Sequence, residues 1–333
     1  MNLDKQVPAL LRVENLQKYF QVRKGWLGRK IQTLKAVDGL TFDLRRGETL
    51  GLVGESGCGK TTAGKTILRL YEPDGGRVVF DGHDVVGASE KQMLALRRQM
   101  QIVFQDPYDS LNPRKTVEQA LGEPMAYHRI VERRRARERV AELLSLVGLP
   151  VACMNRYPHE FSGGQRQRIV IARALCLGPQ FIVCDEAVSS LDVSIQAQII
   201  NLLQDLQTQL ALTFLFISHD LRIVKHISDR VAIMYLGKIV ELGRTEEIYA
   251  HPLHPYTQAL LSAIPVADPS NQPERIILSG DVPTPTRLPK GCRFHTRCWL
   301  KEEICARVEP GFDAVSDDHY VMCHFSRSGK VTR

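Results

Sequence analysis

The sequence feature that most constrains the fold is a glycine-rich turn at residues 54–61, Gly-Glu-Ser-Gly-Cys-Gly-Lys-Thr, here named the phosphate loop. It follows a strand-like apolar run over residues 48–53 and precedes a helical pattern that opens at Thr61. Glycines at these spacings let successive backbone N–H groups point at phosphate oxygens, Lys60 adds a positive charge, and the Thr61 hydroxyl can hold Mg²⁺. A plain turn before a helix is the alternative, but the strand–turn–helix context favours phosphate binding.

Two carboxylates end another short apolar run, residues 181–184, which follows Pro179. Such a run is typical of a buried parallel strand, and carboxylates at its C-terminal end face the crevice where open α/β sheets bind ligands. We expect Asp185 to hold Mg²⁺ through water. Glu186 is expected to polarise a water that attacks a γ-phosphate, an effect typically worth ~10²–10⁴-fold in rate.

Two more strand-like runs each lead to a polar residue. Residues 213–218 precede His219, which is expected to touch the γ-phosphate, and residues 100–104 precede Gln105. Taken singly, such a histidine is more often structural and such a glutamine is usually a solvated loop residue. The order and spacing of all these segments together predict a nucleotide site.

A second glycine turn, Ser162-Gly163-Gly164-Gln165, is here named the signature turn and precedes a helix expected from Gln165 to about Leu177. Ser162 is a good N-cap, and the two glycines leave the first-turn N–H groups uncovered, so the positive end of the helix dipole points outward. We therefore expect an anion to dock there. The alternative, a capped helix beside the chain's own core, leaves Arg166 and Arg168 without a role.

These segments resemble the complete motif set of an ABC-transporter ATPase over about residues 10–250. In chain order they match its Walker A, Q-loop, signature, Walker B, D-loop (Ser190-Leu191-Asp192) and switch histidine. The resemblance implies an α/β fold with a RecA-like P-loop ATPase core and an N-terminal antiparallel β piece. It also implies an inserted helical subdomain and a small cysteine-containing C-terminal domain.

The resemblance assigns roles to residues at matching positions. It implies that Glu186, His219 and Gln105 are catalytic and that Thr61, Gln105 and Asp185 hold Mg²⁺. Residues expected to bind ATP are Phe20, Gly54, Glu55, Ser56, Gly57, Cys58, Gly59, Lys60, Thr61, Thr62, Ser162, Gly163, Gly164, Gln165 and Asp192. Phe20 lies where the family stacks an aromatic ring on adenine, although a core aromatic of an edge strand is the alternative. Ala187 replaces the family's usual proline, which frees the backbone but removes no reacting group.

The same resemblance predicts the domain organisation and the assembly. Residues 1–250 are expected to form the nucleotide-binding domain, with the helical subdomain at about 106–161, and residues 251–333 the C-terminal domain. The helical subdomain docks a short helix of a membrane subunit, and Gln105 is its hinge. The signature turn completes the ATP site of an opposing ATPase subunit, so two ATPs lie at a dimer interface. With no internal repeat in the chain, the second ATPase unit is a separate subunit, and a heterodimer is favoured over a homodimer.

The C-terminal region carries four of the eight cysteines, spaced C-x5-C-x6-C-x17-C as Cys292, Cys298, Cys305 and Cys323. This spacing does not match the usual zinc-finger pairs, and a reducing cytosol does not favour disulfides. Four thiolates can ligate a [4Fe–4S] cluster or Zn²⁺, and free thiols are a third alternative. The family resemblance favours the cluster. The remaining cysteines, 58, 153, 176 and 184, are expected to be small apolar core residues.

Charge and hydropathy bound the cellular context. The net charge is +7 with a pI near 9.0, yet much of the excess lies in residues 129–139, which we interpret as a solvated helix face rather than a membrane-binding surface. Residues 1–5 contain no apolar signal core. The charge-free run 248–267 is interrupted by Pro252, Pro255 and Pro265, so it is not expected to span a bilayer.

Residues 254–261, His-Pro-Tyr-Thr-Gln-Ala-Leu-Leu, resemble the start of the C-terminal region of ATP-binding subunits of dipeptide and oligopeptide importers. We therefore expect an ATPase subunit on the cytoplasmic face of a bacterial inner membrane. Its expected partners are a second ATPase subunit, two transmembrane permeases and, through them, an extracytoplasmic peptide-binding protein; no nucleic acid is expected. The alternatives are a soluble ABC ATPase acting on ribosomes or DNA, a non-hydrolytic regulatory subunit, or an importer of nickel or glutathione-like cargo.

Overall fold

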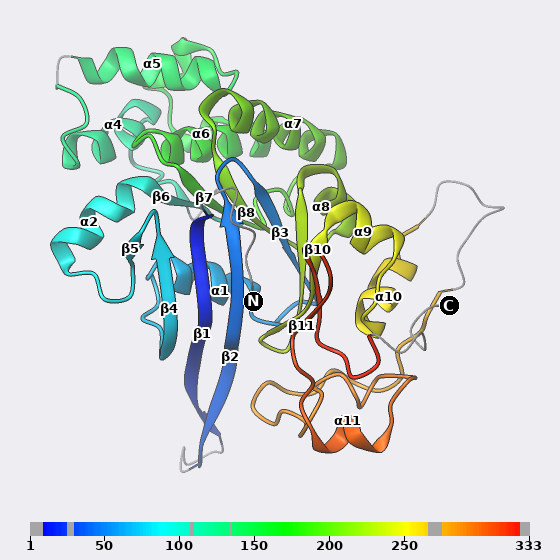
Figure 1. Ribbon diagram of the computed structural model, residues 1–333. Coiled ribbons are helices and arrows are strands. Elements are labelled where there is room, and N and C mark those ends of the chain that lie inside the picture. The colour runs from blue at the N-terminus through cyan, green and yellow to red at the C-terminus, as the bar shows by residue number, and fades with distance from the viewer. Residues whose placement is uncertain (1–8, 25–29, 107–109, 133–134, 266–274, 327–333) are drawn as a thin grey trace. The chain divides into compact units, whose positions relative to one another are not determined.

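The computed structural model describes residues 9–24, 30–106, 110–132, 135–265 and 275–326 (Figure 1). Contacts between residues divide the chain into two compact units. The first unit comprises residues 1–44, 49–86 and 218–333, and the second comprises residues 45–48 and 87–217. The phosphate loop and His219 therefore belong to the first unit, whereas Gln105, Glu186 and the signature turn belong to the second.

An antiparallel sheet forms the N-terminal part of the first unit. Its strands run in the order β2 (Lys30–Arg45), β1 (Ala9–Lys24), β4 (Gly75–Phe80) and β5 (His83–Asp84). On β1, Leu11 and Val13 are buried while Arg12 and Glu14 are exposed, the period-two pattern of a half-buried strand. This sheet is the expected N-terminal antiparallel piece.

A second group of strands in the first unit holds the phosphate loop. Strand β3 (Thr49–Val53) pairs in parallel with β9 (Arg230–Tyr235), and β9 pairs antiparallel with β10 (Lys238–Arg244). Both β3 and β9 are buried along their whole length, as expected for strands covered on both faces. Strand β10 also pairs antiparallel with β12 (His319–Val321), and β12 pairs with β11 (Asp313–Ser316). The C-terminal region thus adds strands to the sheet that carries the phosphate loop.

The helices of the first unit are short. They are α1 (Lys60–Ile67), α8 (Leu221–Ile227), α9 (Thr245–Ala250), α10 (Pro255–Ser262) and α11 (Glu303–Arg307). Helix α10 begins with Pro255, and the His254 ring accepts a hydrogen bond from the Tyr256 N–H, which caps the first turn. Residues 275–302 contain no helix or strand. This irregular segment includes the three prolines 283, 285 and 289, which lack the backbone N–H that helices and strands use.

The second unit contains three parallel strands and most of the long helices. Strand β7 (Phe181–Asp185) pairs with β6 (Met100–Val103) on one side and with β8 (Thr213–Ser218) on the other. Its helices are α2 (Glu90–Gln99), α4 (Val117–Tyr127), α5 (Ala136–Leu146), α6 (Gly163–Leu175) and α7 (Val193–Leu210). Short 3₁₀ helices η2 (Val151–Asn155) and η3 (Pro158–Glu160) lie between α5 and α6 in the chain. Helices α4 to α7 gather together in Figure 1. The described part of residues 106–161 thus contains helices joined by turns.

Three helices of this unit begin with the same four-residue arrangement. Ser89, Thr116 and Ser162 each accept a hydrogen bond from the backbone N–H three residues later. In return, the glutamine at that position accepts from the backbone N–H of the capping residue. This capping box satisfies two backbone donors locally, which explains why α2, α4 and α6 start where they do.

Residues 129–139, interpreted from the sequence as a solvated helix face, are helical only in part. Arg129 has a left-handed backbone, with φ of 52°, just after α4, and α5 starts only at Ala136. Residues 133 and 134 lie outside the described residues. Arg139 pairs with Glu142 at 2.6 Å and Arg137 with Glu118 at 3.4 Å, and all four of these side chains are solvent-accessible. The solvent exposure of these arginines agrees with the interpretation of this region as a solvated helix face.

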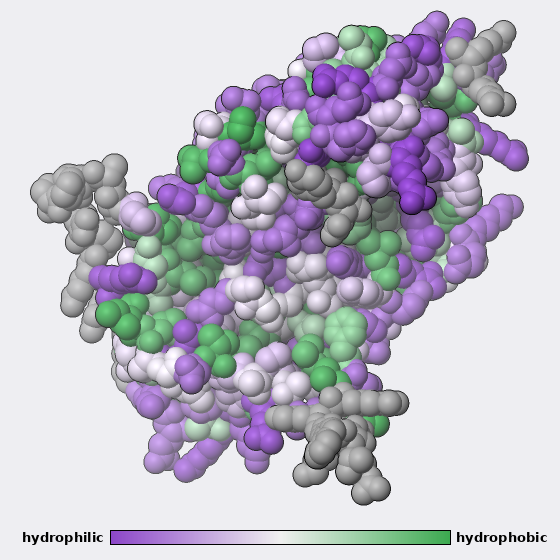
Figure 2. All heavy atoms as spheres, turned by 180° about the vertical axis from the view of Figure 1, so that it is seen from behind, coloured by the Kyte–Doolittle hydropathy of each residue, from purple (hydrophilic) through white to green (hydrophobic). Residues whose placement is uncertain are grey.

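No helix among the described residues is long and apolar enough to cross a membrane. The charge-free run from residue 248 is divided between the end of α9 and helix α10. Its last two residues, 266 and 267, and the N-terminal residues 1–5 lie outside the described part of the chain. On the face drawn in Figure 2, hydrophobic side chains form small areas interrupted by hydrophilic ones.

Candidate functional site

The phosphate loop connects β3 to α1 through a backbone that requires glycine. Gly57 and Gly59 have φ values of 80° and 110°, in the left-handed region. A Cβ at Gly59 would lie 2.0 Å from the Ala36 carbonyl oxygen, and one at Gly54 would lie 2.1 Å from the Met234 carbonyl oxygen. Gly59 is also the N-cap of α1 and makes no side-chain cap. The first-turn N–H groups of α1 are thus suited to an anion.

Lys60 belongs to the same loop and is 4% exposed. Its ammonium group donates to the carbonyl oxygens of Gly54 at 2.8 Å and Glu55 at 3.1 Å. Thr61 and Thr62 follow in the first turn of α1. The positive charge is therefore held against the loop whose N–H groups the sequence predicted to bind phosphate.

Phe20 and His219 also belong to the first unit. Phe20 is a half-buried residue of β1 whose ring packs edge-on against Tyr71, with ring centroids 5.6 Å apart. The Lys18 ammonium lies 5.4 Å from the Phe20 ring centroid. His219 is exposed and directly follows β8, while its neighbour Asp220 caps α8. The exposure of His219 allows a ligand contact, whereas part of the Phe20 ring packs against Tyr71.

In the second unit, the two carboxylates follow the predicted strand. Asp185 is the buried last residue of β7, 4% exposed, and Glu186 is half-buried. The Glu186 backbone has φ of 49° and its N–H donates to the Ile217 carbonyl at 3.0 Å. Ala187 is buried behind it.

Gln105 and Glu186 are in direct contact. The Gln105 side-chain amide donates to a Glu186 carboxylate oxygen at 3.2 Å. Strands β6 and β7 are neighbours in parallel register, so the loops after them meet at the same edge of the sheet. The sequence predicted both residues as part of the site but not this hydrogen bond between them.

The signature turn opens α6 earlier than expected. The helix spans Gly163–Leu175, so both glycines lie in its first turn rather than before it. Ser162 accepts from the Gln165 N–H at 3.4 Å, and Gln165 accepts from the Ser162 N–H at 3.1 Å. The Ser162 hydroxyl hydrogen is not used by this capping box and can be donated to an anion.

Arg166 and Arg168 both bind backbone carbonyls of this chain, so the expectation that a capped helix leaves them without a role was wrong. Arg166 is 7% exposed, and its guanidinium donates to the Pro158 carbonyl at 2.7 Å. Arg168 donates to the Val147 carbonyl, also at 2.7 Å. Both arginines therefore attach α6 to the segments that precede it.

The D-loop segment lies beside the signature turn. A Cβ on Gly164 would lie 2.6 Å from a methyl carbon of Ile195 in α7, so only glycine allows this close packing. Asp192 is the exposed N-cap residue of α7, and its carboxylate makes no cap hydrogen bond. The proximity of these two helix starts was not predicted from the sequence.

The four C-terminal cysteines are close enough to influence one another. Burial, together with smaller effects of the neighbouring Cys292, Cys323 and Cys305, raises the pKa of Cys298 to about 12. Burial likewise raises the pKa of Cys292 to about 11. The Cys292 N–H donates to the Cys305 carbonyl at 2.8 Å, so these two cysteines lie side by side. The other four cysteines are buried, as expected of apolar core residues.

The histidines near these cysteines have other hydrogen-bond partners. A His319 ring nitrogen lies 2.9 Å from a carboxylate oxygen of fully buried Glu241, and His295 lies 2.7 Å from the Cys292 carbonyl. His324 lies 3.0 Å from the Val308 carbonyl. Among the described residues, no three histidine, cysteine or acidic side chains converge closely enough to hold one metal ion.

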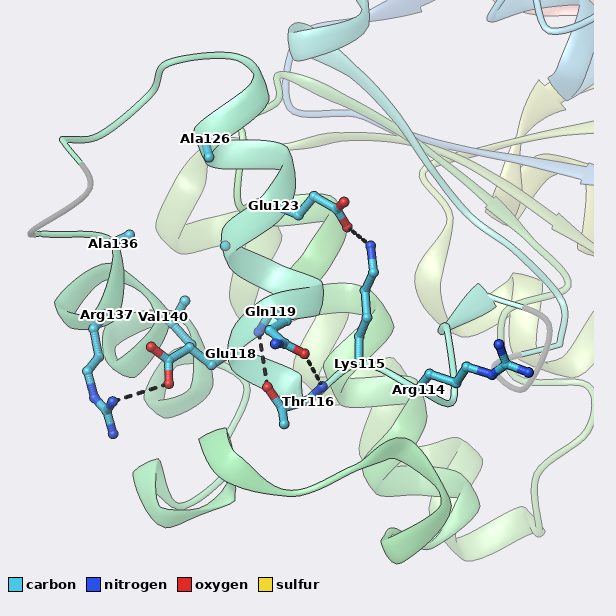
Figure 3. A pocket seen from close by; sticks show the side chains of 11 residues that line it. Arg114, Lys115, Thr116, Glu118, Gln119, Glu123, Ala126, Ala136, Arg137 and Val140 are labelled. Atoms are coloured by element: carbon cyan, nitrogen blue, oxygen red, sulfur yellow. Dashed lines mark hydrogen bonds and ion pairs between the residues drawn. The ribbon is translucent and has the colours of Figure 1, made fainter.

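A pocket of about 830 Å³ lies between α4 and α5 of the second unit (Figure 3). Thr116 and Gln119 of the capping box line it, together with Lys115, which pairs with Glu123. On the α5 side, Arg137 reaches Glu118. The pocket thus combines polar and charged side chains with apolar surface from both helices.

Similarity to known proteins identifies the family. Residues 37–189 match the family model described as ABC transporter, and residues 240–305 match that of the oligopeptide/dipeptide transporter C-terminal region. The oligopeptide transport ATP-binding protein AppF of Bacillus subtilis is 54% identical over 319 residues, which is 95% of this chain and 97% of AppF. This chain belongs to the ABC transporter family.

Other members of the ABC transporter family support the same assignment. A putative peptide import ATP-binding protein of Brucella ovis is 52% identical over 314 residues, covering 94% of this chain and 97% of that protein. The structure of cbiO1 from Clostridium perfringens has a TM-score of 0.63 and 28% identity, covering 73% of this chain and 91% of that one. The dimeric ATP-binding cassette MJ0796 bound to ADP and Pi has a TM-score of 0.62 and 25% identity, covering 71% of this chain and 98% of that one. The predicted RecA-like P-loop ATPase fold is therefore confirmed, and the chain is an ABC ATPase that binds ATP and Mg²⁺.

Proposed function

We propose that this ABC ATPase powers a bacterial importer of di- and oligopeptides. The observation that carries the proposal is the phosphate loop, because the helix that follows it has no side-chain cap and can receive phosphate. Peptide cargo is supported by the match of residues 240–305 and by relatives that are named for oligopeptide or peptide transport. Residues 1–250 are the nucleotide-binding domain and residues 251–333 the C-terminal domain of this subunit.

In this proposal, Lys60 and the first-turn amides of α1 hold the ATP phosphates and Phe20 stacks on adenine. The other residues proposed to bind the phosphates are those of the rest of the loop and one residue of α1: Gly54, Glu55, Ser56, Gly57, Cys58, Gly59 and Thr62. Mg²⁺ held by Thr61, Gln105 and Asp185 would offset the negative charge of the phosphates.

Glu186 is the residue that activates water. Its carboxylate accepts a proton from the water that attacks the γ-phosphate, and His219 contacts that phosphate. The hydrogen bond from Gln105 to Glu186 supports a role for Gln105 as a sensor, because a ligand that binds Gln105 must compete with this contact.

A second ATPase subunit completes each site. The proposed contact is the signature turn, Ser162, Gly163, Gly164 and Gln165, with Asp192, against the γ-phosphate of ATP on the facing subunit. The free hydroxyl hydrogen of Ser162 and the positive end of the α6 dipole support this contact. The facing subunit is proposed to be a different ABC ATPase, so that the pair is a heterodimer.

Two transmembrane permeases attach this subunit to the cytoplasmic face of the inner membrane. We assign the pocket between α4 and α5 as the docking site for a short helix of one permease, because both helices belong to the inserted helical region (Figure 3). An extracytoplasmic binding protein delivers the peptide to the permeases. Charge reversal at Lys115, with release of the chain from purified permeases as the readout, tests this docking surface.

Cys292, Cys298, Cys305 and Cys323 are proposed to hold a [4Fe–4S] cluster. The proposal is supported by the hydrogen bond from the Cys292 N–H to the Cys305 carbonyl and by the mutual influence of the four thiols on their pKa values. Thiols on a cluster bind separate iron atoms, so they need not converge as tightly as ligands of one zinc ion. Iron and sulfide analysis with a visible spectrum, on protein purified anaerobically, decides between cluster, zinc and free thiols. Cys298→Ser is expected to lose the iron, whereas Cys176→Ser is the control.

Phosphate release by the full chain with its permeases in proteoliposomes tests the function as a whole. We expect hydrolysis that rises when peptide-loaded binding protein is present, and peptide accumulation that requires ATP. A preparation that hydrolyses ATP but responds only to a nickel or glutathione-like ligand would change the cargo. Co-purification with ribosomes or DNA instead of permeases would contradict the importer assignment.

A further inference from the structure

Glu55, the second residue of the phosphate loop, forms hydrogen bonds through its backbone N–H, its carbonyl and its carboxylate. The partners are Tyr256, Lys60 and Arg297. Its backbone N–H donates to the Tyr256 hydroxyl at 3.0 Å, and its carbonyl accepts from Lys60 at 3.1 Å. Its carboxylate accepts two hydrogen bonds from the Arg297 guanidinium, at 3.0 and 3.2 Å. All of these residues belong to the first unit.

Arg297 is itself fixed by its surroundings. Its side chain is 9% exposed, against 28% for Glu55. Hydrogen bonds from a guanidinium to a partly buried carboxylate are stronger than neutral ones and fix the geometry of both groups.

An aromatic cluster supports the tyrosine that holds the loop backbone. Tyr256 is fully buried, and its ring lies 4.7 Å from the Tyr235 ring and 5.4 Å from the Phe294 ring, measured between centroids. Phe294 also packs against Tyr235 at 5.4 Å. The cluster therefore combines β9, α10 and the cysteine-containing segment into one packed group beside Glu55.

We propose that Arg297 and Tyr256 are positioning residues of the nucleotide site, through which the C-terminal domain shapes the phosphate loop. Arg297 neutralises the Glu55 carboxylate, which would otherwise place a negative charge beside the negatively charged phosphates of ATP. Tyr256 fixes the orientation of the Glu55 peptide group. The inference rests on the proposed role of the phosphate loop and names two residues outside the nucleotide-binding motifs.

The experiment measures the Kd of a fluorescent ATP analogue on the full-length chain. We expect Arg297→Gln to weaken binding about tenfold and Arg297→Lys to recover part of the loss, because a charge-assisted hydrogen bond is removed or retained. Adding Glu55→Gln to Arg297→Gln is expected to restore most of the affinity, because the unpaired carboxylate is then gone. Tyr256→Phe, which keeps the ring, is expected to weaken binding a few-fold.

Arg307→Gln is the matched control. Arg307 pairs with Glu303 at 3.1 Å in the same C-terminal domain, but both side chains are highly exposed, so no change in Kd is expected. Thermal unfolding of each variant separates a loss of positioning from a loss of folding. If Arg297→Gln does not fold, Glu55→Gln still tests the contact between Glu55 and Arg297. Tyr256→Phe still tests the hydrogen bond between the Tyr256 hydroxyl and the Glu55 N–H.

The outcomes distinguish this inference from the proposed function. Wild-type affinity in Arg297→Gln, or a further loss instead of a recovery in the double variant, would overturn the positioning role. If Lys60→Ala loses binding in the same assay while Arg297→Gln does not, only the positioning role fails. Wild-type affinity in Lys60→Ala would instead contradict the assignment of the phosphate loop itself.

Discussion

The chain contains two glycine turns that each open a helix, and they are stabilised in opposite ways. The phosphate loop has left-handed glycines, no side-chain cap, and contacts from residues about two hundred positions away in sequence. The signature turn has its own capping box, closed within the four residues 162–165. The first turn leaves its amides for a ligand and depends on the surrounding fold for its shape. The second is self-supporting and can present its helix end to another molecule.

This difference predicts that binding and hydrolysis can be separated by mutation, with the largest effect at Glu186. In Glu186→Gln, we expect unchanged ATP affinity and hydrolysis slowed ~10²–10⁴-fold, because an amide cannot accept the proton of the attacking water. Phosphate release and nucleotide Kd on the same preparation provide the check, together with gel filtration, which should show a dimer retained by ATP. Glu142→Gln, on the surface of α5, is the control. Turnover at the wild-type rate would remove Glu186 from the mechanism.

Lys60→Ala is expected to have the next largest effect, and on binding rather than on chemistry alone. Loss of charge-assisted hydrogen bonds to phosphate should raise the Kd for ATP about a hundredfold. Lys65→Ala, near the end of the same helix, should leave the Kd unchanged. Equal affinities in the two variants would show that the loop charge is not used for phosphate.

Ser162→Ala distinguishes the signature turn from the phosphate loop, because ATP should still bind to the free chain with unchanged affinity. We expect hydrolysis to fall about tenfold, since the hydroxyl that meets the facing subunit's phosphate is lost, with Kd unchanged. The control is Ser89→Ala, which removes the same capping bond from α2. Each substitution should cost about 1 kcal/mol of helix stability. Equal loss of hydrolysis in both variants would reduce Ser162 to a helix cap.

The smallest expected effect is on folding stability and concerns His254, the N-cap residue of α10. Burial lowers the pKa of His254 to about 4, although nearby Glu241 opposes the shift. Because the unfolded chain then binds the proton more tightly, stability falls as pH drops below about 6.5, by about 1 kcal/mol between pH 7 and 5.5. Urea unfolding at both pH values measures this change. His254→Asn retains a capping side chain, so its pH dependence should be smaller by that amount; an identical pH dependence would contradict the assignment to His254.

Local signals explain what the sequence could predict. The capping residue Ser162, the apolar strand before Asp185 and the glycine spacing of the phosphate loop all depend on neighbours within a few residues. The same local reasoning placed the start of α6 too late, because a capping box tolerates glycine in the first helical turn. It also interpreted residues 129–139 as one helix face, although Arg129 has a left-handed backbone and α5 starts only at Ala136.

Contacts between distant segments explain what the sequence could not predict. Arg297 and Glu55 are separated by 242 positions, and His319 and Glu241 by 78. Arg297 lies in the irregular segment 275–302, which has no periodicity from which a partner could be inferred. The pairing of Gln105 with Glu186 likewise depends on the neighbouring register of β6 and β7.

Dilution of the chain tests most directly whether a facing subunit completes the phosphate loop's site. The quantity to measure is the rate of ATP hydrolysis per chain as this chain and its partner ATPase subunit are diluted together in equal amounts, with this chain as wild type or as Ser162→Ala. A rate per chain that falls on dilution, and that is lower throughout in Ser162→Ala, is the predicted result. A rate that stays constant on dilution and is unaffected by Ser162→Ala would contradict it.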